Sequence, residues 1–407
     1  MKPHTKYIIT SLIALCLCSL AMAADAYSES TKVTENPMSQ FIKGADYEMG
    51  TGGVEKNYKI AFDYYKKSAE QGYAHAQLCL AILYGQGKGV AEDKRQAVFW
   101  LQKAADQGLA PAQTRLAYAY ANGTEVAEDM KKALYWLRKA AESGEAEAQS
   151  VLGKFYETGR GVEQNAREAV RWYQKAAEQG NISAQVNLGM CYSNGHGIEK
   201  NAVNAVFWYK KAVEQGSPRA RSNLGLCYLQ GTGVQRDVNE AIKLFRASSE
   251  QGDSIGQYNL SLCYRNGTGV AKSSQLEFYW LRKAAERGFV VAQNDLGLSY
   301  ADGDGVTRDS RQAVHWLSKA AKQGNGMAQF NLARQYLQGE GIPVDYVEGL
   351  AWLYLARENC AEKEQPNYYI NISERHLDSA IVASARKRYE ILSKEITRNT
   401  IQANNRE

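Results

Sequence analysis

Proline and histidine are scarce in this sequence, which holds six prolines and five histidines among 407 residues. Collagen-like and proline–glycine low-complexity classes are excluded, because the 35 glycines lie within alanine-rich sequence that favours helices. The histidines are scattered along the chain and never stand at the spacing of metal ligands. We therefore expect no metal site.

Catalytic motifs are missing as well. The sequence has no H-E-x-x-H and no G-x-S-x-G, and no glycine loop is followed by the Lys-Ser or Lys-Thr pair that binds phosphate. Its glycine turns connect helix to helix, so they indicate tight turns with positive φ rather than a nucleotide site. We expect a protein that is not an enzyme and needs no cofactor.

The chain also lacks a strong excess of one charge. Its formal net charge is +5, and this falls to +3 if Lys2 and Lys6 are removed with the first residues. Nucleic acid and an anionic membrane surface are therefore not expected as partners.

Only one long apolar run is present, and it lies at the N-terminus. A basic start, the run from Tyr7 to Leu20 and the A-x-A pattern at Ala21–Ala23 predict a signal peptide over residues 1–23, an uncleaved anchor being the alternative. Residues 24–40 are rich in Ser, Thr and Glu and predict a flexible leader. We expect a bacterial protein, periplasmic or secreted, with no integral membrane span after cleavage.

The rest of the sequence repeats every 36 residues. Glycine recurs at this spacing from Gly72 to Gly324, leucine from Leu80 to Leu332 and tyrosine from Tyr84 to Tyr336. All seven tryptophans share one phase of the repeat, which favours a core position over an aromatic ligand platform. A regular period of this length is typical of solenoid proteins.

Each unit predicts two helices. The first starts near an A-x-A-Q segment, as at Ala74, and ends in a G-x-G-V turn. The second follows a residue suited to cap a helix N-terminus. The nine capping residues are Asn57, Asp93, Asp129, Asn165, Asn201, Asp237, Ser273, Asp309 and Asp345.

A unit this small cannot bury its apolar stripe alone, so the units must stack. We predict an all-α protein, an α-solenoid superhelix of 36-residue helix-turn-helix repeats. The array spans residues 41–357, with about eight full units after a partial first one. Residues 358–407 form a helical C-terminal cap, with a longer helix over about 374–397.

These units resemble the Sel-one-like repeat family, a branch of the tetratricopeptide superfamily marked by the G-x-G-V turn. The resemblance rests on segments such as Ala205–Ala212 (A-V-F-W-Y-K-K-A) and Ala220–Tyr228 (A-R-S-N-L-G-L-C-Y). It implies a bacterial exported protein that acts in envelope assembly or in contact with host factors. Some relatives have been linked to penicillin binding, and Ser384–Lys387 matches S-x-x-K, but its K-T-G and S-D-N partners are absent.

Cys79, Cys191, Cys227, Cys263 and Cys360 remain after the signal peptide. Packed helices lie about 8–10 Å apart, which is too far for disulfides between cysteines of equal phase. Although some relatives with this repeat are cysteine-rich, we expect these residues to be small apolar side chains.

One polar column on the first helices is a candidate site: Asn187, Asn223, Asn259, Asp295 and Asn331. In tetratricopeptide relatives this helix lines a concave groove, and its asparagines hold the backbone of a bound peptide. The alternative is that these residues bond only to neighbouring helices. A neighbouring column that includes Tyr118 and Arg334 varies in chemistry and would tune specificity.

The sequence therefore predicts a scaffold that binds a protein or peptide. Two other classes stay open. One is a cell-wall hydrolase with β-lactamase or penicillin-binding activity, and the other is a structural platform of a polysaccharide or secretion machine.

Overall fold

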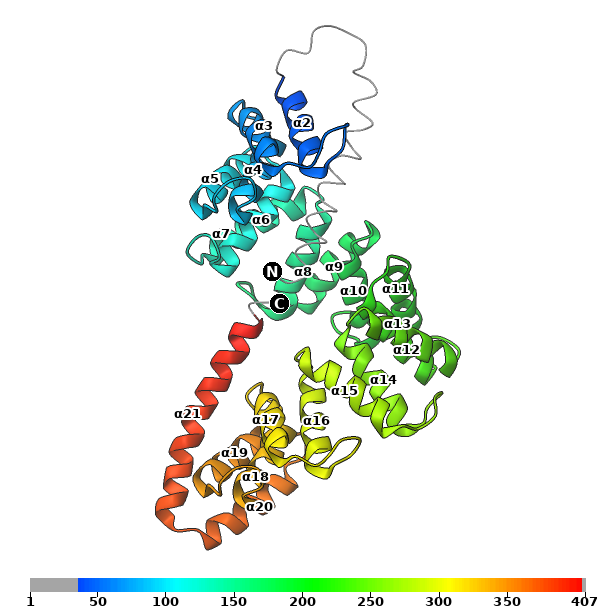
Figure 1. Cartoon of the computed structure of the whole chain (residues 1–407), viewed down its shortest axis with the longest axis vertical. Helices are drawn as coiled ribbons and strands as arrows, with labels where there is room; N and C mark the ends of the chain where they lie inside the picture. Colours follow the sequence, from blue (N-terminus) through cyan, green and yellow to red (C-terminus); the bar gives the residue numbers. More distant parts are fainter. Residues whose placement is uncertain (1–35, 405–407) are drawn as a thin grey trace. The chain divides into compact units, whose positions relative to one another are not determined.

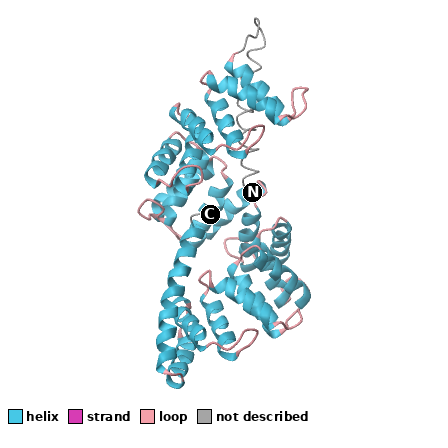
Figure 2. Cartoon of the chain, turned by 60° about the vertical axis from the view of Figure 1, so that its left-hand side comes forward, coloured by secondary structure: helices cyan, strands magenta, loops and turns pink. Residues whose placement is uncertain are grey.

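The structure is a computed structural model that describes residues 36–404 and the side chains up to residue 398. Helices and loops make up this part of the chain, and it contains no strand (Figure 2). The expected signal peptide, residues 1–23, lies outside the described residues. The expected leader ends earlier than residue 40, because a helix begins at Pro37 and is capped by the side chain of Asn36.

The helices alternate between the two members of each repeat (Figure 1). The first helices are α2 (Pro37–Met49), α4 (Ala74–Gln86), α6 (Ala110–Asn122), α8 (Ala146–Thr158), α10 (Ile182–Asn194), α12 (Pro218–Gln230), α14 (Ser254–Asn266), α16 (Val290–Asp302) and α18 (Gly326–Gln338). The second helices are α3 (Tyr58–Glu70), α5 (Lys94–Asp106), α7 (Met130–Glu142), α9 (Ala166–Glu178), α11 (Ala202–Glu214), α13 (Val238–Glu250), α15 (Ser274–Glu286), α17 (Ser310–Ala321) and α19 (Tyr346–Asn359).

The chain forms two compact units. The first ends at Leu116 and includes Glu125–Ala127, and the second takes Ala117–Thr124 and all residues from Glu128. In the first unit α2, α3, α4 and α5 pack in chain order, and in the second the same holds from α7 to α19. The predicted all-α solenoid is confirmed.

The second helices begin where the sequence predicts. Each of the nine capping side chains accepts a hydrogen bond from a backbone N–H in the first helical turn. Asn57 is typical, since its Oδ1 accepts from the N–H groups of Lys59 and Ile60 at 3.1 and 3.2 Å. Each cap satisfies backbone donors that have no partner inside the helix.

The G-x-G-V turn brings two repeats into backbone contact. Gly195 ends α10 with φ 74°, and Gly197 follows with φ 71°. A Cβ atom on Gly197 would lie 2.2 Å from the carbonyl oxygen of Ala166, at the start of α9. The turn therefore requires glycine at Gly197 for two reasons: its φ is positive, and any side chain would collide with the backbone of the preceding repeat.

The repeated apolar residues form the core. The leucine column from Leu80 to Leu332 is at most 4 % exposed throughout. Trp100, Trp136, Trp316 and Trp352 are buried, and the other three tryptophans are half-buried between helices. The expectation that tryptophan is a core residue is confirmed.

A pair of glutamines ties the repeats together. In the repeat 182–217, Gln185 Nε2 donates to the carbonyl of Ala177 on the preceding second helix, at 3.2 Å. Gln215 Nε2 then donates to Gln185 Oε1 at 2.9 Å. We call this chain of bonds the glutamine relay. It recurs in four other repeats, at Gln77 and Gln107, Gln149 and Gln179, Gln293 and Gln323, and Gln329 and Asn359.

The relay is interrupted in three repeats. In the repeat 110–145, Gln113 Nε2 donates to the carbonyl of Ala105 at 3.0 Å, but Ser143 takes the place of the second glutamine. Arg221 takes the place of the first glutamine in the repeat 218–253, and Arg287 takes the place of the second in the repeat 254–289. As a result, Gln257 Oε1 is buried with no hydrogen-bond partner among the described residues. These two repeats carry other polar contacts instead, such as Ser222 Oγ with Asp253 Oδ2 at 2.6 Å.

Two helices close the array, α20 (Glu364–His376) and α21 (Ser379–Asn404). Ala385, Leu392 and Ile396 of α21 are buried in a cluster that includes side chains of α19. The longer helix expected over about 374–397 is α21, which starts later because Asp378 caps it by accepting from Ala380 N at 2.7 Å. Helical capping residues follow the array as predicted.

Replacing Gly197 by alanine should lower the melting temperature far more than replacing Gly180. Both glycines have positive φ, so each variant loses about 1–2 kcal/mol to backbone strain. Only Gly197→Ala adds a clash with backbone, because a Cβ on Gly180 would meet nothing within 4 Å. Thermal unfolding followed by circular dichroism measures both, and equal shifts would contradict the close approach.

Candidate functional site

The candidate column lies on one face of the first helices. Positions three and four residues apart share a side of a helix, so each asparagine is flanked by one residue a turn before it and another a turn after it. We call these residues of α12, α14 and α16 the first-helix face: Arg219, Asn223, Leu226, Ile255, Asn259, Leu262, Val291, Asp295 and Leu298. Since α12 contacts α14 directly, the columns run from one repeat to the next.

Two asparagines in this face have unused donors. Asn259 is 9 % exposed, and its Nδ2 is buried without a hydrogen-bond partner in the described part of the chain. Asn223 is half-buried, and its Nδ2 is likewise buried without a hydrogen-bond partner among the described residues. A buried donor that makes no bond costs about 1–3 kcal/mol, so native proteins rarely keep one without a reason.

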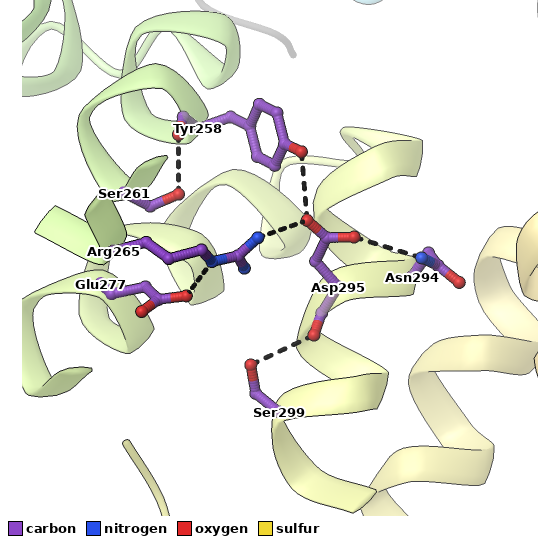
Figure 3. Close-up of polar contacts among 7 residues, drawn as sticks. All are labelled: Tyr258, Ser261, Arg265, Glu277, Asn294, Asp295 and Ser299. Carbon is purple, nitrogen blue, oxygen red and sulfur yellow. Dashed lines mark hydrogen bonds and ion pairs between the residues drawn. The ribbon is translucent and has the colours of Figure 1, made fainter. Parts of the chain in front are cut away.

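Asp295 and Asn331 are instead used within the protein. Tyr258 Oη donates to Asp295 Oδ2 at 3.1 Å, and Arg265 Nη1 lies 3.5 Å from the same oxygen (Figure 3). Asn331 Nδ2 donates to Asn294 Oδ1 at 3.0 Å. For these two residues the structure supports the alternative of bonds between neighbouring helices, whereas it shows no hydrogen-bond partner for the Nδ2 groups of Asn223 and Asn259 among the described residues.

The remaining candidates differ from one another. Asn187 is half-buried on α10. Tyr118 on α6 is 38 % exposed and donates to Glu147 Oε1 of the next first helix at 3.3 Å. Arg334 on α18 is half-buried, and its Nε is buried with no partner among residues 36–398. Tyr118 therefore belongs to an internal contact, and Arg334 carries an unused donor.

Sequence reasoning missed Arg265 and Glu277. Arg265 Nε donates to Glu277 Oε1, and Glu277 is only 4 % exposed (Figure 3). Burial alone would lower the pKa of Arg265, but the hydrogen bond to Glu277 and the charges of Glu277 and Asp295 raise it. The sequence did contain a signal for this contact, because Glu277 occupies a position that is alanine in most second helices.

The S-x-x-K segment lies near the start of α21, inside the helix. Ser384 Oγ donates to the carbonyl of Ala380 at 2.8 Å, as a serine inside a helix commonly does. Within residues 36–398, no three His, Cys, Asp or Glu side chains are grouped so as to hold a metal ion. None of the described helices is both long and apolar enough to cross a membrane.

The five cysteines of the described chain form no disulfide, as predicted. Four are buried and Cys79 is half-buried. Burial raises the pKa of Cys191 to about 12 and that of Cys263 to about 11, since the nearby apolar groups disfavour a thiolate. These thiols are therefore poor nucleophiles.

Replacing Asn259 by alanine should leave stability nearly unchanged, whereas Asn331→Ala should lower it. Asn331→Ala leaves Asn294 Oδ1 buried without its donor, which costs about 1–3 kcal/mol, but Asn259→Ala removes a donor that is already unsatisfied. Urea unfolding of the two variants measures the difference. A large loss for Asn259→Ala would show that its amide has an internal partner.

A thiol count should give five free thiols in denatured protein that lacks residues 1–23. Before denaturation, Cys191, Cys227 and Cys263 should react with a disulfide reagent much more slowly than a surface thiol, because they are buried and their pKa values are raised. Three or fewer free thiols after denaturation would show at least one disulfide and contradict the prediction.

The Sel1 repeat family model matches the chain nine times in succession. The matches cover residues 41–73, 74–109, 110–145, 146–181, 182–217, 218–253, 254–289, 290–325 and 326–359. They agree with the predicted array of about eight full units after a shorter first one. No curated protein matches the chain at a significant level.

Two solved structures are similar over most of their length. One is c5321, a protective antigen present in uropathogenic Escherichia coli strains, with 31% identity over 89% of this chain and 85% of that chain and a TM-score of 0.54. The other is a Sel1 repeat protein from Oxalobacter formigenes, with 30% identity over 84% of this chain and 96% of that chain and a TM-score of 0.55. Repeat folds of this kind generally mediate protein–protein interactions. The chain belongs to the Sel1 repeat family.

Proposed function

We propose that this protein is a non-enzymatic scaffold that binds an extended segment of a partner protein along the first-helix face. One observation carries the proposal. Asn223 and Asn259 hold buried Nδ2 donors without partners, in a protein that satisfies most of its other buried amides. An extended segment has one carbonyl per residue, so it would supply the acceptors that these donors lack.

The surroundings of the two asparagines support a peptide ligand. Leu226, Leu262 and Leu298 form a half-buried row on one side of the column, and Ile255 and Val291 stand on the other. Val291 is 40 % exposed. Apolar side chains on both sides of a backbone-binding column suit a chain whose residues point alternately to either side.

We also propose that the protein is exported to the bacterial periplasm or secreted. The basic start, the apolar run and the A-x-A pattern within residues 1–23 support this. One similar protein is a protective antigen present in uropathogenic strains, which supports a role in contact with a host. Envelope assembly is the other role that an exported scaffold of this family would serve, and only the partner distinguishes the two.

Replacing both Asn223 and Asn259 by alanine should weaken binding of the partner without unfolding the array. Two lost hydrogen bonds weaken binding by about 1–3 kcal/mol, or roughly five- to 150-fold. The measurement is quantitative mass spectrometry of proteins captured from periplasm and from host-cell contact by immobilised wild type and variant.

A double variant of exposed asparagines, Asn239→Ala on α13 with Asn371→Ala on α20, is the matched control. This control also loses two side-chain amides, but at positions outside the first-helix face. It should capture the partner as well as wild type does. If the Asn223 and Asn259 variant keeps its helicity and captures the same proteins in the same amounts, the proposed face is wrong.

A further inference from the structure

Two side chains break the repeat pattern at one place, and an arginine joins them. Glu277 on α15 stands where seven other second helices have a buried alanine. Asp295 on α16 stands where α10, α12, α14 and α18 have asparagine. Arg265 on α14 lies between these two carboxylates and contacts both. The two departures and Arg265 therefore form one cluster, which the other repeats lack.

The cluster holds the Asp295 carboxylate in a fixed position. Tyr258 and Arg265 reach its Oδ2 from α14, and Asn294 Nδ2 donates to its Oδ1 at 3.2 Å (Figure 3). Glu277 in turn fixes Arg265 from the side of α15. An aspartate has two oxygens with about four acceptor sites, so these three donors leave one site unused.

The charges of the cluster do not balance. It contains two carboxylates, Glu277 and Asp295, and one guanidinium, Arg265. Among the described residues, Arg265 is the sole ion-pair partner of either carboxylate. The Asp295 side chain is 16% exposed, whereas that of Glu277 is 6% exposed, so the excess negative charge is accessible at Asp295.

Asp295 is the next residue of the column after Asn223 and Asn259, which carry the unused donors. Consecutive first helices pack about 8–10 Å apart, and an extended chain advances about 3.3 Å per residue. A segment bonded to Asn223 and Asn259 therefore reaches Asp295 about three residues further on. At that point the protein offers a negative acceptor instead of a neutral donor.

We propose that the segment bound along the first-helix face carries a lysine or arginine whose charged group pairs with Asp295. This proposal rests on the proposed function and specifies its partner: an extended segment with apolar side chains next to Leu226, Leu262 and Leu298, followed by a basic residue. The basic group supplies the positive charge that the cluster lacks, and a partly desolvated pair of this kind selects strongly between partners.

An acidic segment is the competing partner. Arg219 on α12 and Arg334 on α18 lie beside the column, and neither forms an ion pair within the described chain. An acidic segment would have to pass Asp295 without compensation, since its carboxylate would meet like charge there. The test below separates the two partners.

Selection from a phage-displayed library of random peptides on the protein without residues 1–23 tests the proposal. Peptides of about twelve residues are long enough to cross the four first helices from α10 to α16. Wild type should enrich peptides in which an apolar stretch precedes a lysine or arginine. Asp295→Asn, which restores the residue common to the column and keeps an acceptor for Tyr258, should enrich apolar peptides without this basic preference.

Asp302→Asn is the matched control, since it removes one negative charge from the exposed end of the same helix. It should keep the basic preference of wild type. For a peptide enriched on wild type, Asp295→Asn should weaken binding about tenfold in calorimetry and Asp302→Asn by less than about twofold, as expected for loss of one charged hydrogen bond.

Each other outcome has its own meaning. The pairing with Asp295 would be overturned if the enriched peptides lack a basic residue, carry an acidic one, or bind Asp295→Asn as well as wild type. These results would not affect the proposed binding along the first-helix face. Peptides that bind the Asn223→Ala and Asn259→Ala double variant as well as wild type, or the absence of any enrichment, would overturn both this inference and the proposed function.

Discussion

The packing of each repeat on the one before it depends on amide groups buried among apolar side chains. Gln185 shows the arrangement: its Nε2 holds the carbonyl of Ala177 in the preceding repeat, while its Oε1 holds Gln215 in its own. Alanine, leucine and tryptophan columns provide most of the buried area, but apolar contacts have no direction. The buried hydrogen bonds fix the register in which these surfaces meet, because any other register would leave them unsatisfied.

That constraint also explains which positions are free to vary. Most repeats keep their glutamines and both turn glycines, every second helix keeps its capping residue, and none of these residues belongs to the first-helix face. The residues of the first-helix face are therefore free to vary, and two of its features differ from ordinary packing. Asn223 and Asn259 keep buried donors unsatisfied, and the cluster of Arg265, Glu277 and Asp295 keeps one negative charge uncompensated. Both features have a cost in the free protein, and the proposed ligand would relieve both.

Much of the fold could be predicted from the sequence, because local interactions determine it. The capping role of Asn57 and the turn role of Gly197 follow from their own backbone preferences. The contacts between helices could not be predicted. Gln185 meets Gln215, and Tyr258 meets Asp295, through helix packing that the period alone does not define. For the same reason the sequence could not separate Asn259, with its unused donor, from Asn331, which bonds to Asn294.

Hydrogen–deuterium exchange of the protein with and without a bound peptide tests the central claim most directly, since it locates the ligand without any substitution. If the partner lies along the first-helix face, a saturating peptide selected on wild type should slow exchange in α12, α14 and α16 and leave α11, α13 and α15 unchanged. Slower exchange confined to the second helices or to the cap of α20 and α21 would contradict the account.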